Sequence, residues 1–366
     1  MTKIFKASPS LPPPVNSVGP VAWIRQNLVS TPFNTALTLI SLYILYLLVP
    51  PVISWAIINA TWDGESKADC TAGGACWAFI RVRFDQFMYG RYPLEEYWRI
   101  NLGCILLIVL IGMYAIKVVN KTILTTFILI AYPVIAYLLF AGGLLGLEQV
   151  ETELWGGLFL TVLLGIIGII ASFPLGVLLA LGRRSNMPIV KSVCIIFIET
   201  IRAVPLITIL FMASVMIPLF LPDGLNFNKM LRVLIGITLF SAAYMAEVIR
   251  GGLQAIPKGQ YEAADAMGLT YWQSMLLVIL PQALKLVIPG IVNTFIALFK
   301  DTTLVYIVGM FDLLGMIQLA SHSPKWLGTT IEGYAFSGFL YWIICFSMSR
   351  YSMTVERKLE TGHKRN

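Results

Sequence analysis

Residues 251–281 read GGLQAIPKGQYEAADAMGLTYWQSMLLVILP, and they interrupt a chain that is otherwise dominated by long apolar runs. This segment is too polar to cross a membrane, yet from Gln260 to Met267 it consists mostly of good helix formers. Gly268 can end that helix, and apolar residues recur at helical spacing beyond it, up to Pro281. We therefore predict two short helices joined at a glycine, set between two membrane-spanning helices.

The composition around this segment is that of an integral membrane protein. Hydrophobic residues make up 58% of the 366 positions, charged residues only 12%, and the mean hydropathy is +0.80, which lies outside the range of soluble domains. Apolar runs of about 18 residues or more recur, each long enough to cross ~30 Å of hydrocarbon as a helix. We predict an all-α polytopic protein with about eight spans, at residues 33–58, 101–118, 122–142, 155–182, 190–220, 232–250, 286–310 and 331–349.

Lys and Arg residues indicate the orientation of these spans. If both termini are cytoplasmic, the inner segments carry about twice as many basic residues as the outer ones, as the positive-inside rule requires. This orientation places the polar loop 59–100 outside and residues 251–281 inside. Residues 1–32, with their Leu-Pro-Pro-Pro tract, and residues 351–366 then form cytoplasmic tails. The basic residues are scattered and form no nucleic-acid-binding stripe.

The cysteines and histidines of the chain indicate whether a disulfide or a metal site is to be expected. Three of the five cysteines lie in apolar runs, where a buried small side chain is the plain interpretation. Cys70 and Cys76 lie in the outer loop, where a disulfide and two free thiols are equally compatible with the sequence. The histidines are His322 and His363, and no Cys or His cluster has metal-ligand spacing, so we predict no metal site.

Glu199 and Arg202 are ionisable residues inside a predicted span. At the centre of a membrane helix each such charge costs ~2.5–3.5 kcal/mol, so each should face a partner, a cavity or water. The two residues lie three positions apart and can pair on one helix face, just before Pro205, which loosens the backbone. Lining of a solute path and bracing of helix packing are both compatible with this pattern.

Lys300 and Asp301 form a second intramembrane charged pair. Neighbouring residues point about 100° apart around a helix, so these two cannot pair well with each other, and at least one needs a partner elsewhere. Asn293 lies one to two turns earlier and is a weaker candidate for lining a path. Bracing between helices and lining of the path again remain open alternatives.

Residues 251–281 also resemble the EAA motif of ABC importer permeases. The matching positions are Glu262, Ala263, Ala264, Gly268, Leu280 and Pro281. Val278 stands where the family has isoleucine, a mild departure. The resemblance implies that this loop is a coupling helix that sits in a cleft of a cytoplasmic ATPase. It places Glu262, Ala263, Ala264 and Gly268 at that contact.

Three further stretches resemble the polar amino-acid uptake permeases of the histidine and glutamine type. They are ETIRAVPL at 199–206, AEVIRGG at 246–252 and LFKDTTL at 298–304. The matches cover residues 153–350, which implies a type I importer core of five helices. Residues 33–152 then add about three N-terminal helices. This longer layout, with its ending at 361–365, looks like one of the two permeases of the general L-amino-acid importers of the Aap or Bzt type.

The resemblance implies a transport subunit of the bacterial inner membrane, not an enzyme. Such a subunit forms half of the translocation pathway for an L-amino acid and works by alternating access. The implied partners are a second permease in a heterodimer, two ATP-binding subunits and a periplasmic binding protein. The chain contains no G-x-x-x-x-G-K-[ST] phosphate loop. We therefore expect no cofactor on this chain and ATP on a partner subunit.

Two other function classes remain as alternatives. An ion-gradient-driven secondary transporter should show paired broken helices in two related halves of the sequence. A non-transporting membrane scaffold needs no docking loop and should tolerate changes at Glu262 and Gly268.

Overall fold

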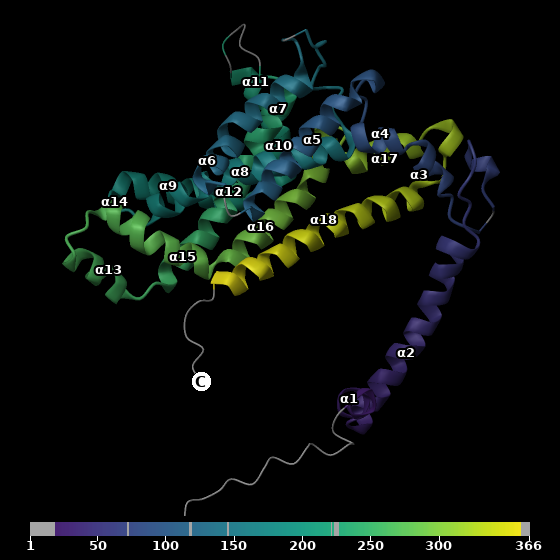
Figure 1. The fold of residues 1–366 in the computed structure, drawn as a ribbon, viewed down its shortest axis with the longest axis horizontal. Coiled ribbons are helices and arrows are strands. Elements are labelled where there is room, and N and C mark those ends of the chain that lie inside the picture. Colours follow the sequence, from purple (N-terminus) through teal and green to yellow (C-terminus); the bar gives the residue numbers. More distant parts are fainter. Residues whose placement is uncertain are drawn as a thin grey trace, which may run out of the picture. The chain divides into compact units, whose positions relative to one another are not determined.

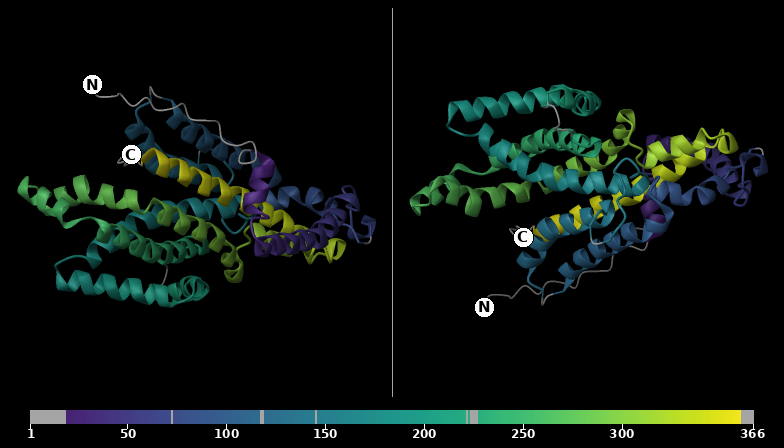
Figure 2. Two further views of the ribbon diagram at one scale, coloured as in Figure 1. Left: turned by 90° about the horizontal axis from the view of Figure 1, so that it is seen from below. Right: turned by 90° about the horizontal axis from the view of Figure 1, so that it is seen from above.

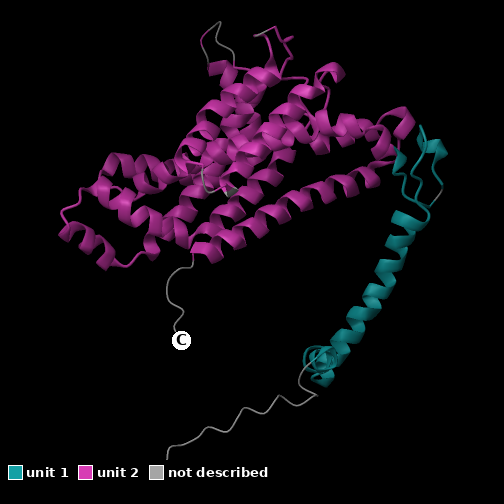
Figure 3. Cartoon of the chain, viewed as in Figure 1, with its two compact units in different colours: residues 1–78 teal, residues 79–366 magenta. Residues whose placement is uncertain are grey.

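The structure is a computed structural model that describes residues 19–71, 73–116, 119–144, 146–220, 222 and 227–359. The predicted tail residues 1–18 and 360–366 therefore lie outside the described part. The chain divides into two compact units, Met1–Ala78 and Phe79–Asn366 (Figure 3). The regular elements among the described residues are all helical, which confirms the predicted all-α class.

Unit 1 contains helices α1 (Pro20–Asn27) and α2 (Pro32–Ile53), and a π-helical turn at Ser54–Ile58 continues α2. Thr31 caps α2, because its side chain accepts a hydrogen bond from the backbone N–H of Asn34. No residue of α2 is buried within the described structure. A helix that is apolar on every side is typical of a membrane span that faces lipid.

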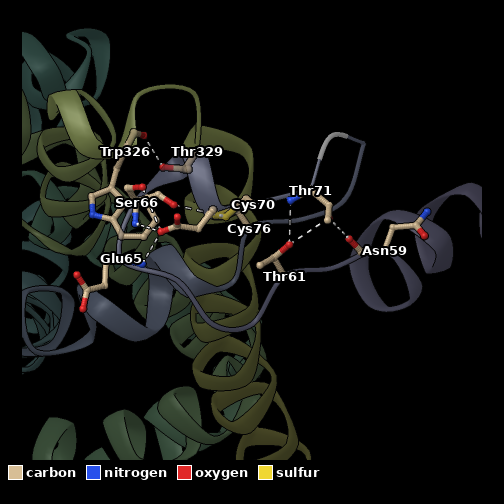
Figure 4. Close-up of a disulfide and its surroundings, with 10 residues drawn as sticks. Asn59, Thr61, Glu65, Ser66, Cys70, Thr71, Cys76, Trp326 and Thr329 are labelled. Carbon is tan, nitrogen blue, oxygen red and sulfur yellow. Dashed lines mark hydrogen bonds between the residues drawn. A yellow bond between two sulfur atoms is a disulfide. The ribbon is translucent and has the colours of Figure 1, made fainter.

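The segment that follows α2 is a loop closed by a disulfide between Cys70 and Cys76, whose Cα atoms lie 5.6 Å apart (Figure 4). Thr71 ties this loop together. Its hydroxyl donates to the carbonyl oxygen of Asn59 over 2.9 Å, and its backbone N–H donates to Thr61 Oγ1 over 3.1 Å. The cross-link and these hydrogen bonds give the polar segment a defined conformation.

Unit 2 is a helical bundle (Figure 1). Its α-helices are α3 (Ala78–Val82), α4 (Phe84–Tyr89), α5 (Tyr97–Gly112), α6 (Lys121–Thr126), α7 (Tyr132–Ala141), α8 (Gly157–Arg183), α9 (Pro188–Ala203), α10 (Leu206–Phe211), α11 (Ile217–Phe220), α12 (Lys229–Ala255), α13 (Lys258–Ala266), α14 (Tyr271–Gln273), α15 (Leu280–Leu286), α16 (Ile288–Asp301), α17 (Leu313–Ser321) and α18 (Thr330–Leu359). Short 3-10 helices lie at Lys67–Asp69 in unit 1 and at Leu94–Glu96, Met113–Ala115, Thr302–Val308 and Pro324–Trp326. Further π-helical turns lie at Phe127–Ala131, Met212–Met216 and Ser274–Ile279.

Six helical stretches of the described structure are long and apolar enough to cross a membrane. They are Pro32–Ile58, Lys121–Ala141, Gly157–Arg183, Lys229–Ala255, Ile288–Val308 and Thr330–Leu359. A seventh is the bent pair Pro188–Ala203 and Leu206–Phe220. The remaining predicted span, 101–118, corresponds to α5, which is 16 residues long. The spans predicted from the apolar runs therefore each have a helical counterpart.

Two predicted boundaries differ from the structure. The stretch 190–220 is not one straight helix, because the chain bends by 105° between α9 and α10. Val204 precedes Pro205 and adopts an extended backbone, as the proline ring disfavours the helical conformation in the preceding residue. The helix α18 also continues past residue 350, where a tail was predicted, and its last turn carries basic residues that suit a helix C-terminus.

The centre of unit 2 is α8, which packs along α12 and against α16 (Figures 1 and 2). Glycines on α8 make this close approach feasible. A Cβ atom at Gly168 would lie 3.2 Å from Leu298 of α16, and one at Gly176 would lie 2.6 Å from Met245 of α12. Small residues at helix crossings are a general device in membrane proteins, because they let backbones approach and gain packing contacts.

The segment before residue 153 shares a buried core with the helices that follow. Tyr92, Phe140, Trp155 and Phe159 belong to one cluster of buried residues, together with residues of α12 and α16. The hydroxyl of Tyr92 donates to the carbonyl oxygen of Phe140 over 2.8 Å. The described residues before position 153 that belong to this cluster, among them Tyr92 and Phe140, therefore pack with the segment that carries the motifs.

A buried carboxyl group, Asp312, opens helix α17. Its side chain accepts hydrogen bonds from the backbone N–H of Gly315 over 2.9 Å and of Leu314 over 3.3 Å, and from the Tyr341 hydroxyl over 3.3 Å. The residue has no exposed surface, and this burial raises the pKa of Asp312 from 3.8 to about 6. The segment between α16 and α18 is thus held by a cap whose charge depends on pH.

Candidate functional site

A cavity of about 310 Å³ lies between α12, α16 and the start of α10. Its lining residues are Leu206, Ile237, Phe240, Ser241, Tyr244, Asn293, Thr294, Ala297, Leu298 and Asp301. Those on α12 and on α16 recur every three or four positions, so each helix turns one face toward the cavity. A space of this size suits a small molecule.

The polar side chains of the cavity include two of the residues singled out from the sequence. Asp301 and Asn293 both line the space, although they lie two turns apart on α16. Asp301 has no ion-pair partner among the described residues. Lys300 is exposed and is not part of the lining. Of the adjacent charged pair only Asp301 therefore lines the cavity, because neighbouring positions on a helix face different directions.

A cluster of five charged residues lies where α8, α9 and α12 meet, and we call it the arginine–glutamate cluster. Its members are Arg183, Glu199, Arg202, Glu247 and Arg250. Glu247 is the centre: its carboxylate oxygens lie 2.9 Å from Arg183 Nη1, 2.9 Å from Arg250 Nη2 and 3.8 Å from Arg202 Nη1. Glu199 lies 2.7 Å from Arg183 Nη1.

The pairing in this cluster differs from the expected local pair. Glu199 binds Arg183 of another helix rather than Arg202 of its own helix. A local pair at three-residue spacing contributes only ~0.2–0.5 kcal/mol, whereas Arg183 bridges two carboxylates at once. In the sequence, Arg183 is one of the basic residues of the predicted inner segments, which indicate only the orientation of the spans. Its position in the last turn of α8 carries no signal of the two glutamates that tertiary packing brings to it.

Arg202 connects the cluster with the cavity. Its guanidinium lies 5.4 Å from the centre of the Tyr244 ring, and Tyr244 lines the cavity. A cation at this distance from an aromatic ring is attracted by the negative face of the ring. Arg202 Nε is buried and has no hydrogen-bond partner in the described structure. Arg202 is therefore the least firmly held cation of the cluster.

Between α12 and α16 the chain forms α13 and, after Gly268, a second helical segment in which α14 continues through the π-helical turn Ser274–Ile279 into α15. This agrees with the prediction of two helices joined at a glycine, although the second helical segment runs past Pro281. Figures 1 and 2 show α13 and α14 at one end of unit 2. Gly268 ends α13 with a φ of +73°, a conformation that residues with a Cβ rarely adopt. Thr270 then starts α14 with a capping box that includes Gln273.

The four motif residues of this loop do not all face the same way. Glu262, Ala263 and Gly268 are exposed. Ala264 is only 3% exposed and packs against its own chain. The exposed trio is available to another protein, whereas Ala264 faces the interior of its own chain.

Comparison with known proteins identifies the family. Residues 172–361 match the family model described as binding-protein-dependent transport system inner membrane component. The chain is 51% identical, over 99% of both chains, to the inner membrane amino-acid ABC transporter permease protein YhdY of Escherichia coli strain K12. The chain belongs to this family. It is a permease subunit of an amino-acid ABC importer.

Two further relatives show how far the likeness of the permease extends. The glutamate/glutamine/aspartate/asparagine transport system permease protein BztC of Rhodobacter capsulatus is 42% identical over 96% of both chains. A solved amino acid ABC transporter with histidines aligns with 55% of the permease and 92% of that chain, at 29% identity and a TM-score of 0.49. The alignments with YhdY and BztC cover nearly the whole length of the permease and so extend beyond residues 172–361 of the family match.

The permease is a multi-span inner-membrane transport subunit and not an enzyme. Members of its family work with other components of an ABC transporter and need no cofactor of their own. Among its described residues no group of His, Cys, Asp or Glu side chains is arranged to hold a metal ion. The cavity, the arginine–glutamate cluster and α13 are the three features of the described structure on which a proposal for the role of individual residues can be built.

Proposed function

We propose that this permease pairs with a second, non-identical permease and that the two form one translocation pathway for L-amino acids. Two ATP-binding subunits and a periplasmic binding protein complete the importer, and ATP-driven motion alternates the access of the pathway. The observation that carries the proposal is the cavity between α12 and α16. Its lining includes a carboxylate that has no ion-pair partner among the described residues and, two helical turns away, an amide.

The chemistry of the cavity fits an amino acid. An amino acid carries an ammonium group and a carboxylate, and Asp301 supplies a negative partner for the ammonium group. Asn293 and Ser241 add neutral hydrogen-bonding groups. Arg202, behind Tyr244, supplies the positive charge that the substrate carboxylate requires. Glu199 belongs to the arginine–glutamate cluster and acts through Arg183 rather than by touching the substrate.

The exposed face of α13 is the proposed contact with the ATPase. Glu262, Ala263 and Gly268 form this contact, with small side chains that allow a close approach and one charge at the edge. Ala264 sets the position of α13 from the other side. Nucleotide binds the ATPase subunits and not the permease.

The proposed topology puts both termini and the 251–281 loop in the cytoplasm and the 59–100 loop in the periplasm. A disulfide such as Cys70–Cys76 persists in an oxidising compartment, which supports the periplasmic side. Residues 33–152 are the proposed additional segment, and residues 153–350 the permease core. Residues 1–32 and 351–366 are the proposed cytoplasmic ends.

Reconstitution tests the proposal. The permease, its ATPase, its second permease and its binding protein are purified as one complex and inserted into proteoliposomes. We expect labelled L-amino acid to enter only when ATP faces the ATPase and the binding protein is on the other side. Uptake that an ionophore abolishes while ATP has no effect would point to a secondary transporter. A complete complex without any uptake would point to a scaffold.

A further inference from the structure

The coupling helix α13 is held to the bundle by few polar contacts, and Tyr261 makes two of them. Its hydroxyl donates to the carbonyl oxygen of Leu253 at the end of α12 and accepts from Arg184 Nη1, each over 3.2 Å. The Arg184 guanidinium also lies 5.7 Å from the centre of the Tyr261 ring. Tyr261 directly precedes the motif glutamate, so it links the proposed ATPase contact to the ends of α8 and α12.

Arg184 links Tyr261 to the arginine–glutamate cluster. It is the C-terminal cap of α8, and its chain neighbour Arg183 closes the last turn of the same helix. Arg183 holds Glu199 of α9 and Glu247 of α12 at 2.7 and 2.9 Å. A displacement of the α8 end must therefore stretch or reorient both of these ion pairs.

The last step of the path leads from the cluster to the cavity. Glu247 lies 3.8 Å from Arg202, and Arg202 lies over the ring of Tyr244, which lines the cavity. Tyr244 and Glu247 are one helical turn apart on α12, so the same helix face carries the ion-pair centre and the cavity wall.

We propose that Tyr261 and Arg184 are positioning residues that couple α13 to the substrate cavity through Arg183, Glu247 and Arg202. The proposal rests on the proposed function. In this proposal Arg202 switches between two positions. It is held by Glu247 while α13 presses Tyr261 against the end of α8. When the contact of Tyr261 shifts, Arg202 is free to bind a substrate carboxylate. Coupling between distant sites needs such a bistable contact, which both ends can bias.

The test uses the complete complex in proteoliposomes with the variant Tyr261→Phe. This change keeps the aromatic ring and removes the hydroxyl that makes both hydrogen bonds. The matched control is Tyr271→Phe, because Tyr271 is an exposed tyrosine of the same loop with no hydroxyl hydrogen bond in the described structure. Amino-acid uptake and ATP hydrolysis are measured in the same vesicles, and the ATPase bound per permease is measured by co-purification.

We expect the Tyr261→Phe complex to bind wild-type amounts of ATPase and to keep its basal hydrolysis. Its uptake per ATP should fall about fivefold, the lower end of typical coupling between sites. The Tyr271→Phe complex should match the wild type. An unchanged ratio of uptake to hydrolysis for Tyr261→Phe would overturn the proposal. Loss of the ATPase would also overturn it, since Tyr261 would then be a docking residue.

A double-mutant cycle separates coupling from general loss of stability. Tyr261→Phe is combined with Arg202→Gln, and the ratio of uptake to hydrolysis is measured for all four complexes. Residues in one chain of contacts give a double variant that is little worse than the poorer single variant. If the double variant lowers the ratio of uptake to hydrolysis by the product of the two single effects, Tyr261 and Arg202 act independently, which would contradict the proposed coupling. If the wild-type complex itself shows no uptake, the failure lies with the proposed function and not with this path.

Discussion

Residues 251–281, which we call the coupling loop, contact the end of α8 next to the arginine–glutamate cluster, yet the loop and the cluster are built in opposite ways. The loop takes its shape from consecutive residues: a helix of nine residues, one glycine with positive φ and one capping box. The cluster takes its shape from three helices, the consecutive helices α8 and α9 and the more distant α12, whose side chains meet at Glu247. The comparison teaches that the proposed contact surface for the ATPase is encoded by consecutive residues, whereas the ion pairs proposed to respond to it depend on tertiary packing.

The largest effect is expected from the two alanines of the coupling helix. Ala263→Leu adds bulk to an exposed position, so the permease should stay folded while the ATPase no longer binds, and uptake should fall more than ~10-fold. Ala264→Leu is the matched variant at a buried position. It should lower the free energy of unfolding of the permease by ~1–3 kcal/mol through overpacking. Co-purification and thermal melting in detergent measure the two outcomes.

The same phenotype for both alanine variants would break the distinction between the two faces of α13. ATPase binding that survives Ala263→Leu would remove this residue from the proposed contact.

Much of the loop could be predicted from the sequence because its signals are local. Gly268 marks a helix end, and the alternation of polar and apolar residues excludes a span. The burial of Ala264 was not anticipated, because a motif says which residues matter and not which face each one occupies. The bend before Pro205 was anticipated only as a loosened backbone.

The cluster could be predicted only in part. Glu199 and Arg202 stand out as costly charges in apolar surroundings. Their partners do not stand out, since Arg183 looks like any basic residue that flanks a span. Tyr244 resembles an ordinary core aromatic until the fold places it between Arg202 and the cavity.

Asp312 contrasts with the glutamates of the cluster, because it is buried and accepts hydrogen bonds from backbone N–H groups and a tyrosine hydroxyl. Burial raises the pKa of Asp312 from 3.8 to about 6. Between these values the folded protein keeps a proton that the unfolded chain has lost, so the free energy of unfolding should fall as pH rises from about 4 to 6. A shift of this size corresponds to ~3 kcal/mol. Asp312→Asn keeps a capping side chain and removes the titration.

Thermal melting of both proteins in detergent at about pH 4.5 and about pH 7.5 measures this effect. The Asp312→Asn protein should gain stability relative to the wild type at the higher pH. Melting temperatures that change in parallel would show that Asp312 does not titrate in this range.

Removal of single arginines from the arginine–glutamate cluster tests which of them contributes most to the stability of the permease. Arg183→Gln leaves Glu199 without its partner and weakens the hold on Glu247, so it should cost ~1–3 kcal/mol, as for other partly buried charged hydrogen bonds. Arg250→Gln should cost less than ~1 kcal/mol, because Glu247 keeps Arg183. Melting temperatures of the two variants give the comparison. An equal or reversed order would show that Arg183 is not the bridge of the cluster.

The smallest effect is expected from a single methyl group in the loop. Gly268→Ala places a Cβ in a backbone conformation with a φ of +73°, which should cost ~1 kcal/mol and reduce uptake severalfold. Gly259→Ala is the matched control, because an added Cβ there meets no atom within 4 Å and the backbone is helical. Equal uptake by both variants would mean that the turn after α13 tolerates other conformations.

The most direct measurement is the affinity of the reconstituted importer for its amino acid after Asp301→Asn, with Lys300→Gln as the neighbouring control. Asp301 lines the cavity and Lys300 does not. Loss of a charged hydrogen-bond partner should weaken transport at least ~10-fold for Asp301→Asn. Lys300→Gln should stay close to the wild type, and both complexes should retain their ATPase. Wild-type transport by Asp301→Asn, or an equal loss in both variants, would contradict the assignment of this cavity to the substrate.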